Sequence, residues 1–196
     1  MKITRIVVIA AVAGARLWAE SEPGQKATVT VCIESDPYMP SGALPLASKM
    51  FASIGVRIDW REHRCPIGVG AIVVSLSYNR NDEVTNDHGS AQPYEGTHVV
   101  VFPNRVRLLD PYQRQCVLAH VLVHEITHVL EGICRHSATG IKKARWGQRD
   151  YLEMSCKPLP FAQEDVDLIY AGLRVRQAHV ATAVTAAVSE AAVAVQ

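Results

Sequence analysis

The sequence lacks the patterns that would place it in several common functional classes. Its five cysteines form no Cys-x-x-Cys pair, so a structural zinc held by cysteines is not expected. It has no Gly-x-Ser-x-Gly motif, and no cysteine has a neighbourhood that would lower its pKa, which argues against a serine or cysteine hydrolase. Because the formal net charge is only +1, the chain offers no electrostatic basis for binding nucleic acid.

A long hydrophobic run is also missing, and the short run near the N-terminus predicts export. Residues 6–13 are apolar but fall short of the roughly 20 residues that span a bilayer. They follow Lys2 and Arg5 and lead into the small-x-small site of residues 13–15, which is the pattern of a secretory signal peptide. We therefore expect residues 1–19 to be a signal peptide, cut within or at the end of this range, and the protein to be secreted or periplasmic.

The rest of the chain has the length of a single domain followed by a tail rich in Ala and Val. Residues 20–178 form the expected folded domain, which is long enough to bury one core of ordinary size. The tail, residues 179–196, contains His179 and Glu190, which argue against a membrane anchor. We expect the tail to be a frayed helix or disordered, and we expect no stable membrane span.

Cysteine usage bears on disulfides, since an exported protein lies where disulfides persist. One or two bridges are expected, and the odd number of cysteines leaves at least one thiol over. The pairing that we favour from sequence is Cys134 with Cys156, because these two residues flank the region just after the long helix that is expected at 111–131. The five cysteines are Cys32, Cys65, Cys116, Cys134 and Cys156.

The N-terminal half alternates between strand and helix signals, which predicts an α+β fold with a twisted mixed sheet. Residues 79–96 are rich in Asn, Asp, Gly and Pro and are expected to form a long surface loop. The strand that follows this loop is expected to be an edge strand of the sheet. Alternating or β-branched segments predict strands at 27–33, 56–61, 71–77 and 97–102, and apolar residues at helical spacing predict a helix at 45–54.

A long helix is expected at 111–131. Asp110 can cap its first turn, Pro111 suits the first helical position, and Gln113 completes the spacing of a capping box. Apolar periodicity continues until Gly132 ends the helix. Shorter helices are expected at 150–154 and 163–175, forming a small C-terminal helical part.

The long helix carries the motif His-Glu-x-x-His at residues 124–128. Residues four apart lie on the same face of a helix, so His124 and His128 can present two imidazoles to one metal ion. Zinc favours such nitrogen ligands and keeps an open position for water in catalytic sites. Glu125 lies beside His124 and can reach that water as a general base.

A third ligand must come from outside the helix. Gly132 can turn the chain back, so that His136 approaches the same ion. The spacing H-E-x-x-H-x-x-x-G-x-x-x-H is one residue longer on each side of the glycine than the metzincin pattern H-E-x-x-H-x-x-G-x-x-H. The alternatives are carboxylates from later in the chain: Glu164, oriented by Asp167, or Glu153.

Residues 124–146, HEITHVLEGICRHSATGIKKARW, resemble a family of predicted secreted zincin-like metallopeptidases known from acidobacterial genomes. The likeness extends weakly over most of the mature chain. It includes the Pro93-Tyr94-x-Gly96 loop, residues 99–102, and residues 157–161 with Glu164-Asp165-Val166.

The resemblance implies a zincin-like fold and a site carried by His124, Glu125, His128 and His136. The family commonly has Met where this chain has Lys142, just after Thr139-Gly140-Ile141. If that Met forms a floor under the metal, as in metzincins, this chain has Lys142 in its place.

Other polar residues have an ordinary structural explanation. His120 lies on the same helical row as His124 and is expected to be a buried polar group with its own partners rather than a partner of the site. Tyr94 and Tyr151 are possible donors to a developing oxyanion. His63 and His88 lie in loop contexts and are not expected to have a chemical role.

We therefore predict a Zn²⁺-dependent peptidase that cleaves peptide or protein substrates with metal-activated water and Glu125 as general base. An extended substrate is expected to pair with the 97–102 edge through main-chain hydrogen bonds. The alternative is a non-catalytic zinc-binding or interaction domain that retains the zincin fold. A second alternative is a chance motif on a core helix.

Overall fold

The computed structural model describes residues 27–34, 36, 39–62, 70–78, 88–93 and 97–193. The expected signal peptide, most of the expected 79–96 loop, His63, Cys65 and Tyr94 lie outside the described residues.

A five-stranded mixed sheet forms one layer, with strand order β2-β1-β3-β5-β4. All the neighbouring pairs are parallel except β4 with β5, which is antiparallel. The predicted strands are confirmed to within one or two residues. The strands are β1 (Ala27–Ile33), β2 (Val56–Glu62), β3 (Ile72–Leu76), β4 (Gly89–Gln92) and β5 (His98–Val101).

The edge of the sheet differs from the prediction. The 97–102 segment forms β5, which is internal, and the edge on this side is β4, within the segment expected to be a loop. The sequence of β4, Gly-Ser-Ala-Gln, has neither alternation nor β-branched residues, so it carries no local strand signal. Its extended conformation comes instead from antiparallel pairing with β5, in the register Gly89 to Val101 and Gln92 to His98.

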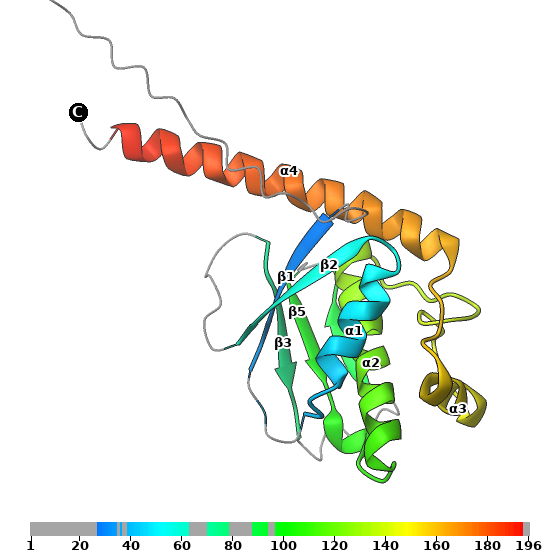
Figure 1. Ribbon diagram of the computed structural model, residues 1–196. Helices are drawn as coiled ribbons and strands as arrows, with labels where there is room; N and C mark the ends of the chain where they lie inside the picture. Colours follow the sequence, from blue (N-terminus) through cyan, green and yellow to red (C-terminus); the bar gives the residue numbers. More distant parts are fainter. Residues whose placement is uncertain are drawn as a thin grey trace, which may run out of the picture.

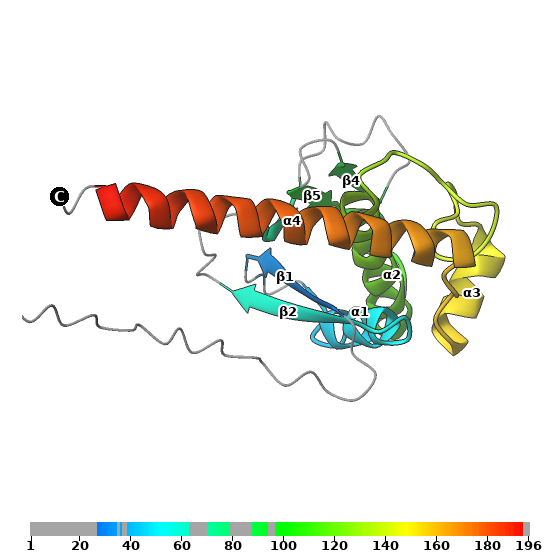
Figure 2. The same cartoon turned by 90° about the horizontal axis from the view of Figure 1, so that it is seen from above.

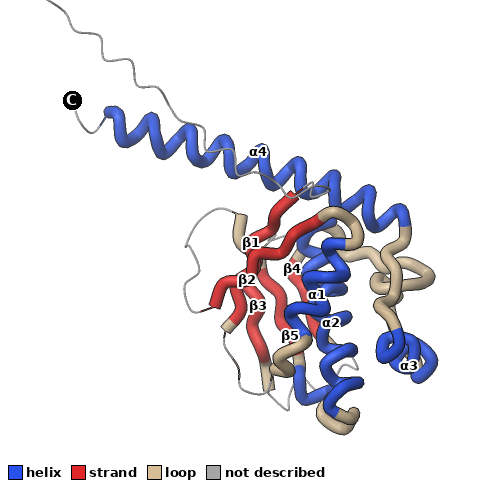
Figure 3. Tube along the Cα trace, viewed as in Figure 1, coloured by secondary structure: helices blue, strands red, loops and turns tan. Residues whose placement is uncertain are grey.

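Two helices lie on the same side of the sheet, α1 (Ala43–Ala52) and α2 (Pro111–Glu131), as Figures 1 and 3 show. At the start of α2, Asp110 Oδ1 accepts from the N–H groups of Tyr112 and Gln113, each at 3.0 Å. The helix ends at Gly132, whose φ of 70° is left-handed. Both ends of this helix agree with the sequence prediction.

Every residue of α2 from Cys116 to Glu131 is buried. A helix buried on all sides must be covered by more than the sheet. Here α1 and the sheet strands β4 and β5 contact part of the helix, and two later helices contact the rest. The polar residues of the motif therefore lie inside the molecule, where their protonation and hydrogen bonds matter most.

The later helices are α3 (Gln148–Cys156) and α4 (Gln163–Val193), which both pack on α2. Figure 2 shows α4 running across the molecule and continuing beyond it. This helix extends well past the predicted 163–175 and includes most of the Ala- and Val-rich tail. No helix in the described ranges combines the length and the apolar character needed to cross a membrane.

The predicted pairing of Cys134 with Cys156 is wrong. Cys134 lies in the loop after α2 and Cys156 is the last residue of α3, and both are exposed free thiols. Cys116 is free and buried. Cys32 in β1 is disulfide-bonded.

Gly172 sets how closely α4 crosses α2. A Cβ at this position would lie 1.7 Å from the Leu130 carbonyl oxygen and 2.9 Å from its carbonyl carbon. Replacing Gly by Ala in a helix usually stabilises it by about 1 kcal/mol. We expect G172A to lower the unfolding free energy by about 2 kcal/mol instead, because the helices must separate.

Urea unfolding of the full chain measures this effect. The exposed A178G variant of α4 is the control and should lose only about 1 kcal/mol through helix propensity. A G172A protein more stable than the native chain would contradict the close crossing.

Candidate metal centre

Three histidines converge at the C-terminal end of α2. His124 and His128 come from successive turns of the helix, and His136 returns from the loop that follows the left-handed Gly132. The ligating atoms of the three histidines all lie within 4.8 Å of one another. The structure thus brings together the three residues that the sequence nominated as metal ligands.

The carboxylates that the sequence left open as third ligands lie elsewhere. Glu164 Oε2 accepts from Arg135 Nη1 at 3.1 Å, with 70% of its side chain exposed. Glu153 pairs with Lys157 on the surface of α3 at 3.4 Å. Neither belongs to the histidine cluster.

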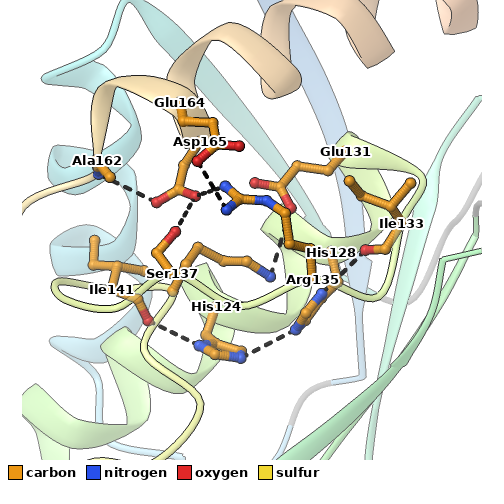
Figure 4. A network of polar contacts seen from close by, with 11 residues as sticks. His124, His128, Glu131, Ile133, Arg135, Ser137, Ile141, Ala162, Glu164 and Asp165 are labelled. Atoms are coloured by element: carbon orange, nitrogen blue, oxygen red, sulfur yellow. Dashed lines mark hydrogen bonds and ion pairs between the residues drawn. The ribbon is translucent and has the colours of Figure 1, made fainter.

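Backbone carbonyls fix the orientation of the two helical imidazoles, as Figure 4 shows. Nδ1 of His124 lies 2.8 Å from the Ile141 oxygen, and Nδ1 of His128 lies 3.3 Å from the Ile133 oxygen. A carbonyl oxygen can only accept, so each neutral ring carries its proton on Nδ1 and exposes a lone pair on Nε2. The two Nε2 atoms are 3.1 Å apart, so these lone pairs face each other and a cation between them would satisfy both.

The protein holds both helical imidazoles in the neutral form that a metal requires. Burial lowers the pKa of His128 to about 4, assisted by the nearby charge of Lys142. Burial also holds the pKa of His124 well below its ordinary value, with the same charge contributing. Protons therefore compete weakly with a metal ion for these two nitrogens at neutral pH.

The loop that carries His136 is tied to the start of α4 (Figure 4). Asp165 is fully buried, and its Oδ1 accepts from Arg135 Nη2 and from Ser137 Oγ, each at 2.5 Å. Its Oδ2 accepts from the Ala162 N–H at 3.2 Å. Both neighbours of His136 are thus anchored by one carboxylate.

A buried ion pair lies beside the histidines. Lys142 Nζ is 3.7 Å from Glu131 Oε2, and both side chains are fully buried. Burial lowers the pKa of Lys142 to about 8 and raises the pKa of Glu131 to about 7. The position at which the resembled family commonly has Met is therefore occupied by a buried cation that acts electrostatically on His124, His128 and Glu125.

The cluster opens into a cavity of about 690 Å³, to which α2, β4 and the 143–151 segment contribute. Glu125, which is 8% exposed, lines this cavity together with the three histidines. A metal ligand set, a carboxylate and open space thus share one site.

Aromatic residues form one wall of the cavity. The ring centroid of Trp146 is 5.3 Å from that of His124, and Tyr151 Oη lies 3.0 Å from His88 Nε2. His88, for which no chemical role was expected, is thus part of the cavity lining. The sequence analysis missed His88 because this residue directly precedes β4, and β4 has no strand signal in the sequence. Tyr151, which the sequence analysis named as a possible oxyanion donor, also lines the cavity.

His120 has partners of its own outside the cluster. Its Nδ1 donates to the Cys116 carbonyl at 2.7 Å, and its Nε2 accepts from the Leu159 N–H at 3.0 Å. It is a buried and satisfied core histidine, as expected.

No family model and no curated protein matches the sequence, but solved structures match the fold. Archaemetzincin from Methanopyrus kandleri has a TM-score of 0.53 at 16% identity, over 78% of this chain and 97% of that chain. A zinc-dependent peptidase from Methanocorpusculum labreanum has a TM-score of 0.51 at 11% identity, over 71% of this chain and 99% of that chain.

At these identities the likeness concerns the fold, and it confirms the predicted zincin-like α+β architecture. The three-histidine cluster, with its paired lone pairs, fits zinc binding. The finer resemblance to the acidobacterial family stays a prediction.

The neutral histidines make the metal-free protein sensitive to acid. The pKa of His128 is about 4 in the folded chain and 6.5 when unperturbed, so between these values the unfolded chain binds more protons. This group therefore stabilises the fold above pH 6.5 and loses that contribution as the pH falls toward 4. On going from pH 7 to pH 5, the unfolding free energy of the native chain should fall by about 2 kcal/mol more than that of H128Q.

Urea unfolding of both chelator-treated proteins at the two pH values gives this difference. Glu131, whose raised pKa acts in the opposite sense below pH 7, is present in both proteins and cancels in the comparison. Equal losses in the two proteins would contradict the neutral, buried state of His128.

Proposed function

We propose that this protein is a zinc-dependent metallopeptidase, with zinc held by His124, His128 and His136 and with Glu125 as general base. The observation that carries the proposal is the pair of Nε2 lone pairs facing each other at 3.1 Å in a cavity that Glu125 also lines. The fold shared with a solved archaemetzincin and with a solved zinc-dependent peptidase supports it.

The chemistry divides between the metal and the chain. When bound, zinc supplies a Lewis acid that lowers the pKa of water and polarises a carbonyl group. Glu125 takes a proton from the attacking water and returns it to the leaving amine. The carboxylate is nearly buried, so it exchanges protons with the reactants rather than with bulk solvent.

The substrate chain is placed by the edge of the sheet. Since β4 is the last strand of the described sheet and lines the cavity, an extended peptide can add to it through main-chain hydrogen bonds. This assigns to β4 the role that the sequence analysis gave to residues 97–102. A peptide on β4 would then pass beside Glu125 and the three histidines, which line the same cavity.

Gly89 allows β4 to approach Glu125 closely. A Cβ at this position would lie 2.7 Å from Glu125 Cγ and 3.0 Å from Oε1. A side chain there would push the carboxylate away from its place beside the histidines. The absence of a side chain at Gly89 therefore leaves the room that Glu125 needs to lie beside the histidines.

We also propose that the protein acts outside the cytoplasm. The N-terminal segment 1–19 has the pattern of a signal peptide. The disulfide bond of Cys32 supports an oxidising compartment.

Glu125→Gln tests the general base. The amide keeps the shape of the side chain but cannot take up the proton, so kcat for peptide hydrolysis should fall by about 100-fold or more. Zinc content, measured by mass spectrometry of the metal, should remain stoichiometric because Glu125 is not a ligand.

The matched control is E153Q on α3, where the partly exposed Glu153 pairs with Lys157 away from the histidines, and this variant should keep full activity. A non-catalytic zinc-binding domain would lose nothing in E125Q, and a chance motif would hold no zinc in any of these proteins. Either result would contradict the proposal.

Gly89→Ala tests the placement of that carboxylate. We expect kcat to fall roughly 10- to 100-fold because the base is displaced. The unfolding free energy should also fall by about 1 to 2 kcal/mol, since the closest contact is with Cγ of the nearly buried Glu125 side chain, which must shift.

The matched control is G147A, where a Cβ would meet nothing closer than 3.9 Å. Full activity in G89A would show that the base does not depend on this close approach.

A further inference from the structure

The cavity that holds the histidines is electrostatically one-sided. Among the described residues that line it, Arg105, Lys143 and Arg145 are cationic and Glu125 alone is anionic. A bound divalent ion would add further positive charge. Substrate groups that enter beside the histidines therefore meet an excess of positive charge.

The three cations differ in how far their charge is already compensated. Lys143 Nζ pairs with Asp150 Oδ2 at 2.7 Å. Arg105 is half-buried, with its guanidinium 5.9 Å from the centroid of the Phe102 ring. Arg145 is exposed, and it forms no hydrogen bond or ion pair with any residue in the described part of the chain.

The backbone on both sides of Arg145 is anchored to the site. Before it, the Lys143 N–H donates to the Gly140 carbonyl at 3.3 Å. After it, Trp146 donates from Nε1 to the same carbonyl at 3.4 Å and packs against His124. The Gly147 N–H donates to Asp150 Oδ2 at 2.7 Å. The guanidinium of Arg145 thus extends from a fixed point on the rim of the cavity.

We propose that Arg145 is a specificity-determining residue that selects peptides carrying a carboxylate close to the scissile bond; this rests on the proposed function. A planar guanidinium donates two parallel N–H bonds to a carboxylate, a geometry that an amide or an ammonium group cannot match. The carboxylate comes either from an Asp or Glu side chain or from the C-terminus of a short peptide. A peptide with lysine in place of that acidic residue would be repelled by the positive charge of the cavity.

Arg145 does not touch the reacting atoms, so its contribution belongs to substrate binding. An interaction that is equally strong in the ground state and the transition state changes KM and leaves kcat unaltered. An exposed ion pair of this kind corresponds to about a five-fold change in affinity. Added salt should weaken it.

The test uses the zinc-loaded full chain and quenched fluorescent peptides that differ at a single position. One series places Glu, Gln or Lys at each position near the scissile bond. A second series compares a free C-terminal carboxylate with its amide, which separates the two sources of the charge. We expect kcat/KM for one Glu peptide, or for the free carboxylate, to exceed its neutral partner by about five-fold, mainly through KM.

Variants of Arg145 assign the preference to this side chain. R145Q should abolish it, R145K should restore part of it, and R145E should reverse it in favour of Lys. The matched control is R149Q, which removes an exposed arginine of α3 that does not line the cavity and should leave the preference intact.

The outcomes separate this inference from the proposed function. Hydrolysis of all peptides without a charge preference, or a preference that survives R145Q, overturns the role of Arg145 and leaves the peptidase intact. If no peptide is cleaved, the proposed function fails. The role of Arg145 is then tested by fluorescence anisotropy, which measures binding of the labelled Glu and Gln peptides. Tighter binding of the Glu peptide that disappears in R145Q supports the role, and equal binding overturns it.

Discussion

The site depends on two imidazole lone pairs that face each other inside the protein. The Ile141 and Ile133 carbonyls accept hydrogen bonds from the Nδ1–H groups of His124 and His128, respectively. The Nε2 atoms of the neutral rings therefore carry no hydrogen, and they lie 3.1 Å apart. Such an arrangement is unfavourable without a cation. Burial makes a proton a poor substitute, since it lowers the pKa of both rings. The two nitrogens therefore present paired lone pairs that a divalent ion can bind.

The helices around α2 maintain this arrangement. Asp165 at the start of α4 anchors both neighbours of His136. Gly172 lets the backbone of α4 contact the backbone of α2 near the end of that helix. The buried pair of Lys142 and Glu131 places further charge close to His124 and His128. Burying an ion pair is costly unless its partners are close, so this pair is an electrostatic feature of the site rather than a source of stability.

The opposite wall of the cavity comes from the sheet edge and the segment before α3. Gly89 brings β4 against Glu125, and Trp146 closes the site beside His124. Arg145 reaches into the same space from an anchored backbone. His124, Glu125 and His128 on α2 thus share one cavity with His136 and Arg145, which come from later parts of the chain.

The sequence by itself determined the ends of α2, through Asp110 and Gly132, and the common face of His124 and His128, because capping and helical periodicity are local. It also nominated His136, since a left-handed glycine turns the chain within a few residues. Only the tertiary structure placed His136, rather than Glu164 or Glu153, beside the two helical histidines. It also made β4 a strand, brought His88 to the cavity and left Cys134 and Cys156 unpaired. Those outcomes depend on contacts between residues far apart in the chain, which no local pattern records; Gly89 became an edge-strand residue because β5 paired with it, not because of its own preference.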